Sequence, residues 1–196
     1  MIEKKYHHGN LKNSLIEAGI ELVNAEGEKH FSLRRVATMC GVSNAAPYSH
    51  FENKEELLEA MKSYVTEQFT EELSNSIKGE DLDNPHTLVK IGKSYVMFFV
   101  KNPQYFEFLF SQSCIRVDLN IENDEQSNFP PFELLKELHF RILRKHGMTD
   151  EKIKDAIISA WATVHGLAAI ATMKGIIYDK NWESKIEDII WKKEEN

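Results

Sequence analysis

Twenty residues near the N-terminus, Ser32 to Phe51, combine small, polar and basic side chains in the order typical of a helix-turn-helix. The run reads SLRRVATMCGVSNAAPYSHF, and Gly41 within it can take the positive φ that a tight turn between two helices needs. Asparagine can pair with the edge of adenine, and an alanine methyl can touch the methyl of thymine. These residue types predict recognition of double-stranded DNA, with the segment after Gly41 in the major groove.

Candidates for base contacts lie at the start of the second predicted helix, and side chains suited to phosphate oxygens lie around them. The base candidates are Asn44, Ala45 and Ala46, and the phosphate candidates are Ser32, Ser43, Tyr48, His50 and Lys54. Asn44 and Tyr48 are four residues apart, so they share a face of an α-helix. Simpler roles stay open: the serines as helix caps, Tyr48 as a half-buried core aromatic and His50 as an uninvolved surface histidine.

The elements that must position these side chains are all predicted to be helices, because apolar residues recur at helical spacing in every long segment. The predicted ranges are 10–26, 32–40, 43–51, 53–78, 85–100, 104–113, 131–145, 150–174 and 182–193. Caps are expected at Asn10, Ser32, Ser43, Asn53 and Thr149, and helix ends at Gly27, Gly147 and Gly175. The pair Asn102–Pro103 is expected to stop one helix and start the next. The acidic stretch 118–127 is expected to be a loop.

The composition is that of an ordinary soluble domain, with 196 residues, 42% hydrophobic residues and a net charge of −7. The first 60 residues hold seven Lys and Arg against nine acids, so attraction to phosphate must come from where the cations sit. The two cysteines, Cys40 and Cys114, do not form a disulfide framework or a metal-binding spacing. The N-terminus lacks the apolar region of a secretory signal, and we expect a cytoplasmic protein.

One segment, from Ala156 to Met173, contains no charged residue and reaches the lower edge of membrane-spanning length. Polar residues within the segment and the charges that bound it favour a buried helix of a soluble protein, or a helix at a subunit interface. A membrane span is the less favoured alternative.

The segment from about Tyr6 to Met61 resembles the DNA-binding domain of the TetR family of bacterial transcription regulators. The resemblance rests on an array that matches in order and spacing: Tyr6-His7-His8-Gly9-Asn10-Leu11, Val36-Ala37, Gly41-Val42-Ser43, Tyr48, His50-Phe51 and Asn53-Lys54. It implies that Arg34 also reads a base, that Asn44 and Ala46 lie at recognition positions, and that Tyr48, His50 and Lys54 contact phosphates. Pro47 departs from the family pattern, and proline in a helix removes an amide donor and crowds an earlier carbonyl.

The remainder of the chain resembles one C-terminal domain type of the same family, through Trp161-Ala162-Thr163-Val164-His165-Gly166. The predicted architecture is therefore all-α, with a three-helix DNA-binding domain over residues 1–55, a connecting helix over about 54–78, and a helical regulatory and dimerisation domain over 80–196. The resemblance implies a homodimer and a small-molecule effector. No spacing of Cys, His or Asp suggests a metal site, and we expect no cofactor.

Two sets of residues are assigned to the regulatory domain. An isologous interface reuses one patch twice, and we expect it to be formed by Ser159, Thr163, Gly166, Ile170, Ile186 and Ile190. An aromatic-lined effector pocket is expected to include Tyr95, Phe99, Phe108, His139, Trp161 and His165. The alternative for most of these aromatics is a packed core, and for the two histidines a structural role.

The sequence as a whole predicts a ligand-responsive repressor that binds a near-palindromic operator as a homodimer. An enzyme is disfavoured because we find no nucleophile motif, phosphate loop, carboxylate pair or metal spacing. A helical protein-interaction module whose helix-turn-helix no longer binds DNA is the alternative, supported by the acidic balance of the first 60 residues and by Pro47.

Overall fold

The computed structural model describes residues 11–111, 115–119, 128–178 and 181–190. The chain forms two compact units. The first unit contains the described residues up to Val65 together with the segment from Glu107. The second contains Thr66–Phe106 and the described residues from Ile115 onward. The predicted cap at Asn10, Cys114 and most of the predicted acidic loop lie outside the described residues.

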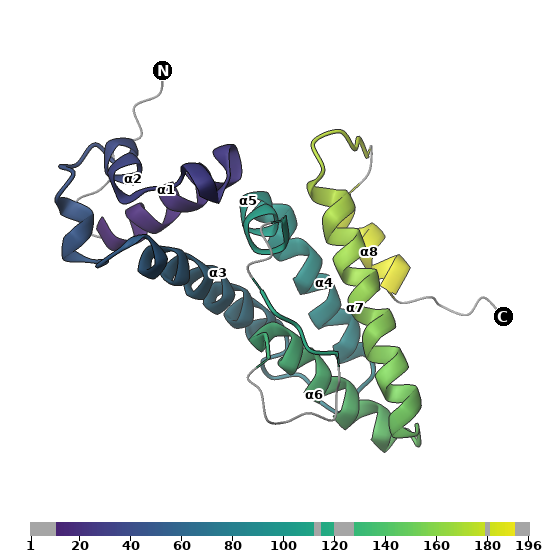
Figure 1. The fold of residues 1–196 in the computed structure, drawn as a ribbon. Helices are drawn as coiled ribbons and strands as arrows, with labels where there is room; N and C mark the ends of the chain where they lie inside the picture. The colour runs from purple at the N-terminus through teal and green to yellow at the C-terminus, as the bar shows by residue number, and fades with distance from the viewer. Residues whose placement is uncertain (1–10, 112–114, 120–127, 179–180, 191–196) are drawn as a thin grey trace. The chain divides into compact units, whose positions relative to one another are not determined.

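The first unit is built on three helices and three short helical turns (Figure 1). In chain order these are α1 (Leu11–Glu26), η1 (Glu28–His30), α2 (Leu33–Met39), η2 (Ala46–Ser49), the first part of α3 (Lys54–Ser76), and η3, a π-helical turn (Glu107–Ser111). Leu15, Val36 and Met61 are fully buried and join α1, α2 and α3 around one core. At Gly19 an added Cβ would lie 2.8 Å from the Met61 sulfur, so this glycine allows α1 to approach α3 closely.

The second unit contains the rest of α3 and five further helices, which Figure 1 shows as a bundle with α7 along its length. They are α4 (His86–Lys101), α5 (Pro103–Phe106), α6 (Pro130–Lys145), α7 (Asp150–Thr172) and α8 (Trp182–Ile190). α7 packs against α4, α6 and α8. In the described part of the chain the regular structure is helical throughout, which confirms the predicted all-α class.

Local sequence signals account for several helix ends. Gly27, Gly41 and Gly147 have φ between 68° and 80°, as expected where a helix or turn ends on glycine. Asn102 ends α4 and Pro103 begins α5, as the Asn-Pro pair predicts. The predicted end at Gly175 is wrong, because α7 already stops at Thr172, where Met173 takes an extended conformation.

α7 is buried on one face only, through Ile153, Ile157, Val164, Leu167 and Ala168. By length and composition it is the one helix in the described chain that could cross a membrane, and only 17% of its most apolar stretch is buried. Its opposite face carries further apolar residues that the protomer does not cover.

Candidate nucleic-acid interface

The turn of the helix-turn-helix is held by backbone and side-chain hydrogen bonds at both ends of α2. The Ser32 hydroxyl accepts the Arg35 amide at 3.4 Å, so Ser32 caps α2 as predicted. At the other end the Val42 amide donates to the Ala37 carbonyl at 3.0 Å, across Gly41 with φ 68°. The buried Cys40 thiol donates to the Ser14 carbonyl at 3.4 Å and so links α2 to α1, while burial raises the pKa of the thiol.

The segment after the turn differs from the predicted α-helix over 43–51, because it is a 3₁₀ turn confined to Ala46–Ser49. The Ala46 amide donates to the Ser43 carbonyl at 3.0 Å, and the Tyr48 amide donates to the Ala45 carbonyl at 3.2 Å. Both hydrogen bonds span three residues, as in a 3₁₀ turn. Pro47, which has no amide and is buried, stands where an α-helix starting at Asn44 would need a donor to the Ser43 carbonyl.

Most of the predicted DNA contacts of this segment are open to solvent. Asn44, Ala45 and Ser43 are exposed, and the Tyr48 side chain is 54% exposed, which excludes the alternative of a core tyrosine. Ala46 and His50 are half-buried. The recognition segment is therefore placed to meet a ligand.

Lys54 has two interactions within the unit that the sequence did not predict. Its ammonium donates to the Glu28 carbonyl at 2.8 Å and lies 5.9 Å from the centre of the Phe31 ring. The adjacent start of α3 is capped as predicted, since the Asn53 side chain accepts the Glu56 amide at 2.8 Å. Lys54 thus both anchors η1 and supplies a cation beside a helix N-terminus.

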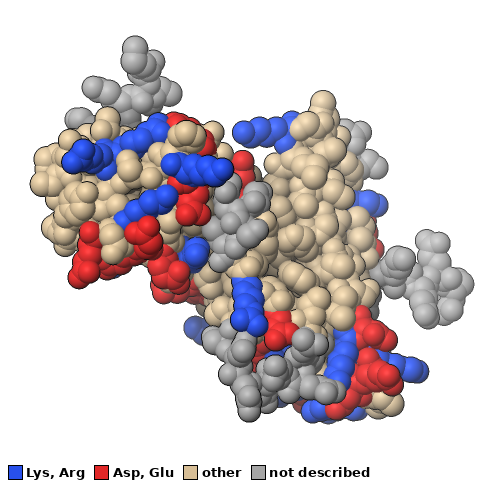
Figure 2. All heavy atoms as spheres, viewed as in Figure 1, with Lys and Arg blue, Asp and Glu red and all other residues tan. Residues whose placement is uncertain are grey.

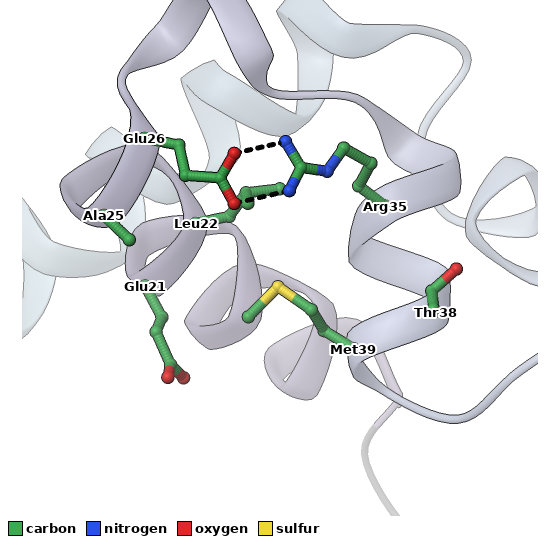
Figure 3. A pocket seen from close by; sticks show the side chains of 7 residues that line it. All are labelled: Glu21, Leu22, Ala25, Glu26, Arg35, Thr38 and Met39. Carbon is green, nitrogen blue, oxygen red and sulfur yellow. Dashed lines mark hydrogen bonds and ion pairs between the residues drawn. The ribbon is translucent and has the colours of Figure 1, made fainter.

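Of the two arginines at the start of α2, Arg34 is exposed and Arg35 is paired. The Arg35 guanidinium donates to both Glu26 carboxylate oxygens, one at 2.6 Å, and to the His30 carbonyl at 3.1 Å. This hydrogen bonding raises the pKa of Arg35 and lowers that of Glu26. Figure 3 shows the pair bridging α1 and α2 at the edge of a hollow of about 290 Å³, beside the Met39 side chain. Arg34 alone remains the basic candidate on α2.

Charge is unevenly distributed over this unit. In Figure 2, Lys and Arg side chains lie across its middle, and Asp and Glu gather along its lower edge. Lys12, on the first turn of α1, is exposed and its ammonium lies 5.8 Å from the centre of the Phe51 ring, next to the recognition segment. Lys12 was not among the phosphate contacts predicted from the sequence, although its position in the first turn of the first predicted helix could have suggested it.

In the second unit three predicted pocket residues form one polar cluster within aromatic surroundings. The Tyr95 hydroxyl lies 3.1 Å from His165 Nδ1. The Trp161 side chain is also hydrogen-bonded to this hydroxyl. Because an indole N–H can only donate, the Tyr95 hydroxyl accepts from Trp161, and the direction of its hydrogen bond with His165 Nδ1 is set by the tautomer of the imidazole.

Burial changes the ionisation of the same cluster. It raises the pKa of Tyr95 well above its usual value and lowers the pKa of His165. The rings of Phe106 and Trp161 flank His165, with centroids 5.1 and 5.6 Å from its own. Both Trp161 and His165 keep partial exposure. The arrangement favours a neutral, hydrogen-bonded histidine at the edge of an aromatic core.

The other predicted pocket residues are Phe99, which packs against this cluster, His139 and Phe108. Phe99 is fully buried and its ring centroid lies 5.5 Å from that of Tyr95. His139 is buried, and its Nδ1–H donates to the Leu135 carbonyl at 2.8 Å, while burial lowers its pKa. Phe108 is fully buried but belongs to the first unit through η3, so we leave it out of the proposed pocket.

The face of α7 predicted to meet a partner is largely uncovered. Ile170 is 44% exposed, Ser159 is exposed, and Thr163 is half-buried. A Cβ added at Gly166 would meet no described atom within 4 Å. Figure 2 shows the surface over the upper part of α7 as almost free of charged residues.

In contrast to this exposed face of α7, the apolar residues of α8 pack within their own protomer. Ile186 is completely buried within the protomer. Ile190 lies 3.1 Å from the position that a Cβ on Gly92 of α4 would occupy. Both residues contribute to packing within the protomer. We leave the buried Ile186 out of the proposed interface and keep the half-buried Ile190.

Among the described residues no group of three or more His, Cys, Asp or Glu side chains is arranged to hold a metal ion.

Residues 15–61, which contain the helix-turn-helix just described, match the family model of bacterial regulatory proteins, tetR family. Residues 15–61 are a DNA-binding segment of the TetR type. TetR regulators are not enzymes. A search of curated proteins gave no match.

Solved structures similar to this chain confirm the fold over nearly its whole length. The putative transcriptional regulator from Pseudomonas aeruginosa PAO1 is 17% identical, with a TM-score of 0.71, over 95% of this chain and 89% of that one. A TetR-like transcriptional regulator from Rhodococcus sp. RHA1 is 16% identical, with a TM-score of 0.62, over 95% and 97% of the two chains. The fatty acid degradation regulator FadR from Bacillus halodurans is 15% identical, with a TM-score of 0.63, over 95% of each chain.

Proposed function

We propose that this regulator is a repressor that binds a near-palindromic operator as a homodimer and responds to a small molecule. The observation that carries the proposal is the solvent exposure of Asn44, Ala45 and Tyr48 on a complete helix-turn-helix. We assign base contacts to Arg34, Asn44, Ala45 and Ala46, and phosphate contacts to Ser32, Ser43, Tyr48, His50 and Lys54. Phosphate contacts position the protein, and base contacts select the sequence.

The homodimer is supported by the uncovered face of α7. Ile158, Ile170 and Met173 are 41%, 44% and 55% exposed, and Ile177 beyond the helix is 95% exposed. Apolar surface of this extent next to a glycine with open space favours burial against a second copy. Two copies would present two recognition segments to two half-sites.

The effector is assigned to the surroundings of Tyr95, Trp161 and His165. Aromatic rings with a few convergent polar groups are the usual lining of a small-molecule site, so the ligand would be partly apolar. The backbone offers two covalent routes toward the DNA-binding unit: α3 continues between the units at Val65, and η3 follows α5 directly. A ligand alters DNA affinity only if it binds the two conformations of the dimer unequally.

The test is selection of DNA from a random duplex library by the protein, followed by salt-dependent affinity measurements on the selected site. We expect an enriched inverted repeat, with binding lost in Tyr48→Ala and Lys54→Glu. Failure to enrich any repeat would favour the alternative, a protein-interaction module that has lost DNA binding.

A further inference from the structure

Pro47 changes which side chains of the recognition segment lie beside one another. In an α-helix, residues four apart share a face, and Asn44 would stand next to Tyr48. The observed turn is 3₁₀, with about three residues per turn, so residues three apart align and a residue four away lies about a third of a turn aside. Ala45 has helical dihedrals (φ −84°, ψ −21°) and its carbonyl accepts the Tyr48 amide at 3.2 Å, so Ala45 and Tyr48 share a face of the turn.

The hydrogen bonds show how firmly this turn is set. The Pro47 carbonyl accepts the amides of His50 and Phe51, both at 2.9 Å, and the Ser49 hydroxyl donates to the Ala46 carbonyl at 2.7 Å. Phe51 is 2% exposed and anchors the end of the segment in the core. Since Pro47 is itself buried, the turn cannot rewind into an α-helix without moving a core residue and a ring that crowds the Ser43 carbonyl.

We propose that Pro47 is a positioning residue for DNA specificity: it places the Ala45 methyl, rather than the Asn44 amide, beside Tyr48 in the reading surface. The inference rests on the proposed DNA-binding function and names the chemistry of that contact. An alanine methyl reads the C5 methyl of thymine, whereas an asparagine amide reads N6 and N7 of adenine. The wild-type protein therefore selects a thymine methyl where an α-helical segment would select adenine.

The experiment uses the protein and the site selected from random DNA, with single groups of its bases replaced in turn. Replacing thymine by deoxyuridine at each position in turn removes only the C5 methyl. Replacing adenine by 7-deazaadenine exchanges the N7 acceptor for a C–H group. For the wild type we expect one thymine per half-site at which deoxyuridine weakens binding about fourfold, the equivalent of one buried methyl. At the adenine paired with that thymine we expect 7-deazaadenine to have less than a twofold effect, because Ala45 and not Asn44 reads this base pair.

Pro47→Leu restores the amide, keeps an apolar side chain at this buried position and permits an α-helical segment. In this variant the deoxyuridine effect should disappear, and 7-deazaadenine at a newly preferred adenine should weaken binding about tenfold, within the range for a two-pronged contact. The matched control is Pro103→Leu, which removes an exposed proline at the first position of α5 in the other unit and should keep the wild-type pattern.

A second pair of variants keeps the proposal testable if Pro47→Leu does not fold cooperatively. Ala45→Gly in the wild-type background should abolish the deoxyuridine effect, and Asn44→Ala should leave it unchanged. The proposal is overturned if Ala45→Gly keeps the effect, or if a folded Pro47→Leu shows the wild-type pattern. Failure of the wild type to enrich any site would instead reject the proposed function.

Discussion

At the scale of the residue, Tyr48 and Lys54 differ in how far a DNA-binding role can be separated from stability. Tyr48 is 54% exposed, so Tyr48→Phe removes a hydroxyl that the protein core does not need. We expect operator affinity to fall about ten- to a hundredfold, the value of one hydrogen bond to a charged phosphate. Thermal unfolding should be unchanged. Fluorescence anisotropy and a melting curve on the same sample check both, and a lowered melting temperature would contradict the assignment.

Lys54→Gln keeps the polarity and most of the length of the side chain but removes the charge. If the ammonium neutralises one phosphate per half-site, the slope of log affinity against log salt should fall by about one per contact. Because Lys54 also donates to the Glu28 carbonyl, a small loss of stability accompanies the change. Lys29→Gln, on the exposed η1 turn, is the matched control, and an equal fall in slope for both variants would show that only net charge matters.

Two histidines of the second unit, His165 and His139, predict that the stability of the protein depends on pH. Burial lowers the pKa of His165 and of His139 below the unfolded value of 6.5, so the unfolded chain takes up protons first as the pH falls. Stability is therefore complete above about pH 6.5 and declines as the pH drops below it, toward the lowered folded pKa values. Chemical denaturation between pH 7.5 and about 5 measures this decline. His165→Gln should reduce the slope, and a slope identical to that of the wild type would exclude His165 as a source.

At the scale of the element, the close contact of α4, α7 and α8 depends on one glycine. A Cβ at Gly92 would lie 3.1 Å from Ile190 Cδ1 and 3.3 Å from Val164 Cγ1. Gly92→Val should therefore push α8 away and lower the free energy of unfolding by about 1–3 kcal/mol, as overpacking does. Urea denaturation checks the value, and hydrogen exchange should show faster exchange of the α8 amides. A stable variant with protected α8 amides would show that α8 packs elsewhere.

Helix existence was predictable at this scale because the signals are local. Ser32, Gly41, Asn53 and the Asn102–Pro103 pair act within one turn of the chain, and each has the predicted role. The recognition segment was harder, because Pro47 and helical spacing point in opposite directions and the buried position of the ring decides between them. The pairing of Arg35 with Glu26 across nine residues and the burial of Ile186 depend on tertiary packing, which no local pattern reports.

At the scale of the whole molecule, the two faces of α7 have different tasks. Val164 and Ala168 hold the helix in its own protomer, while Ile170 and the open position at Gly166 face outward. The sequence indicated both faces from their spacing. It did not indicate that α8 belongs to the protomer core, because an amphipathic helix of nine residues can bury its apolar face equally well against its own chain or a second one.

The proposed dimer is tested by substitutions that the protomer tolerates. Gly166→Leu meets open space within the protomer, and Ile170→Arg replaces a side chain that is already 44% exposed, so both variants should fold. If α7 meets its copy at this face, the added side chain or charge separates the two helices, and sedimentation velocity should show a monomer where the wild type is a dimer. Operator affinity should fall more than a hundredfold, because two half-sites no longer bind as one unit. Ser184→Arg on the exposed side of α8 is the control and should remain dimeric. Dimers in all three variants would move the interface away from α7, while a monomeric wild type that still binds its selected repeat tightly would remove the need for any dimer in DNA recognition.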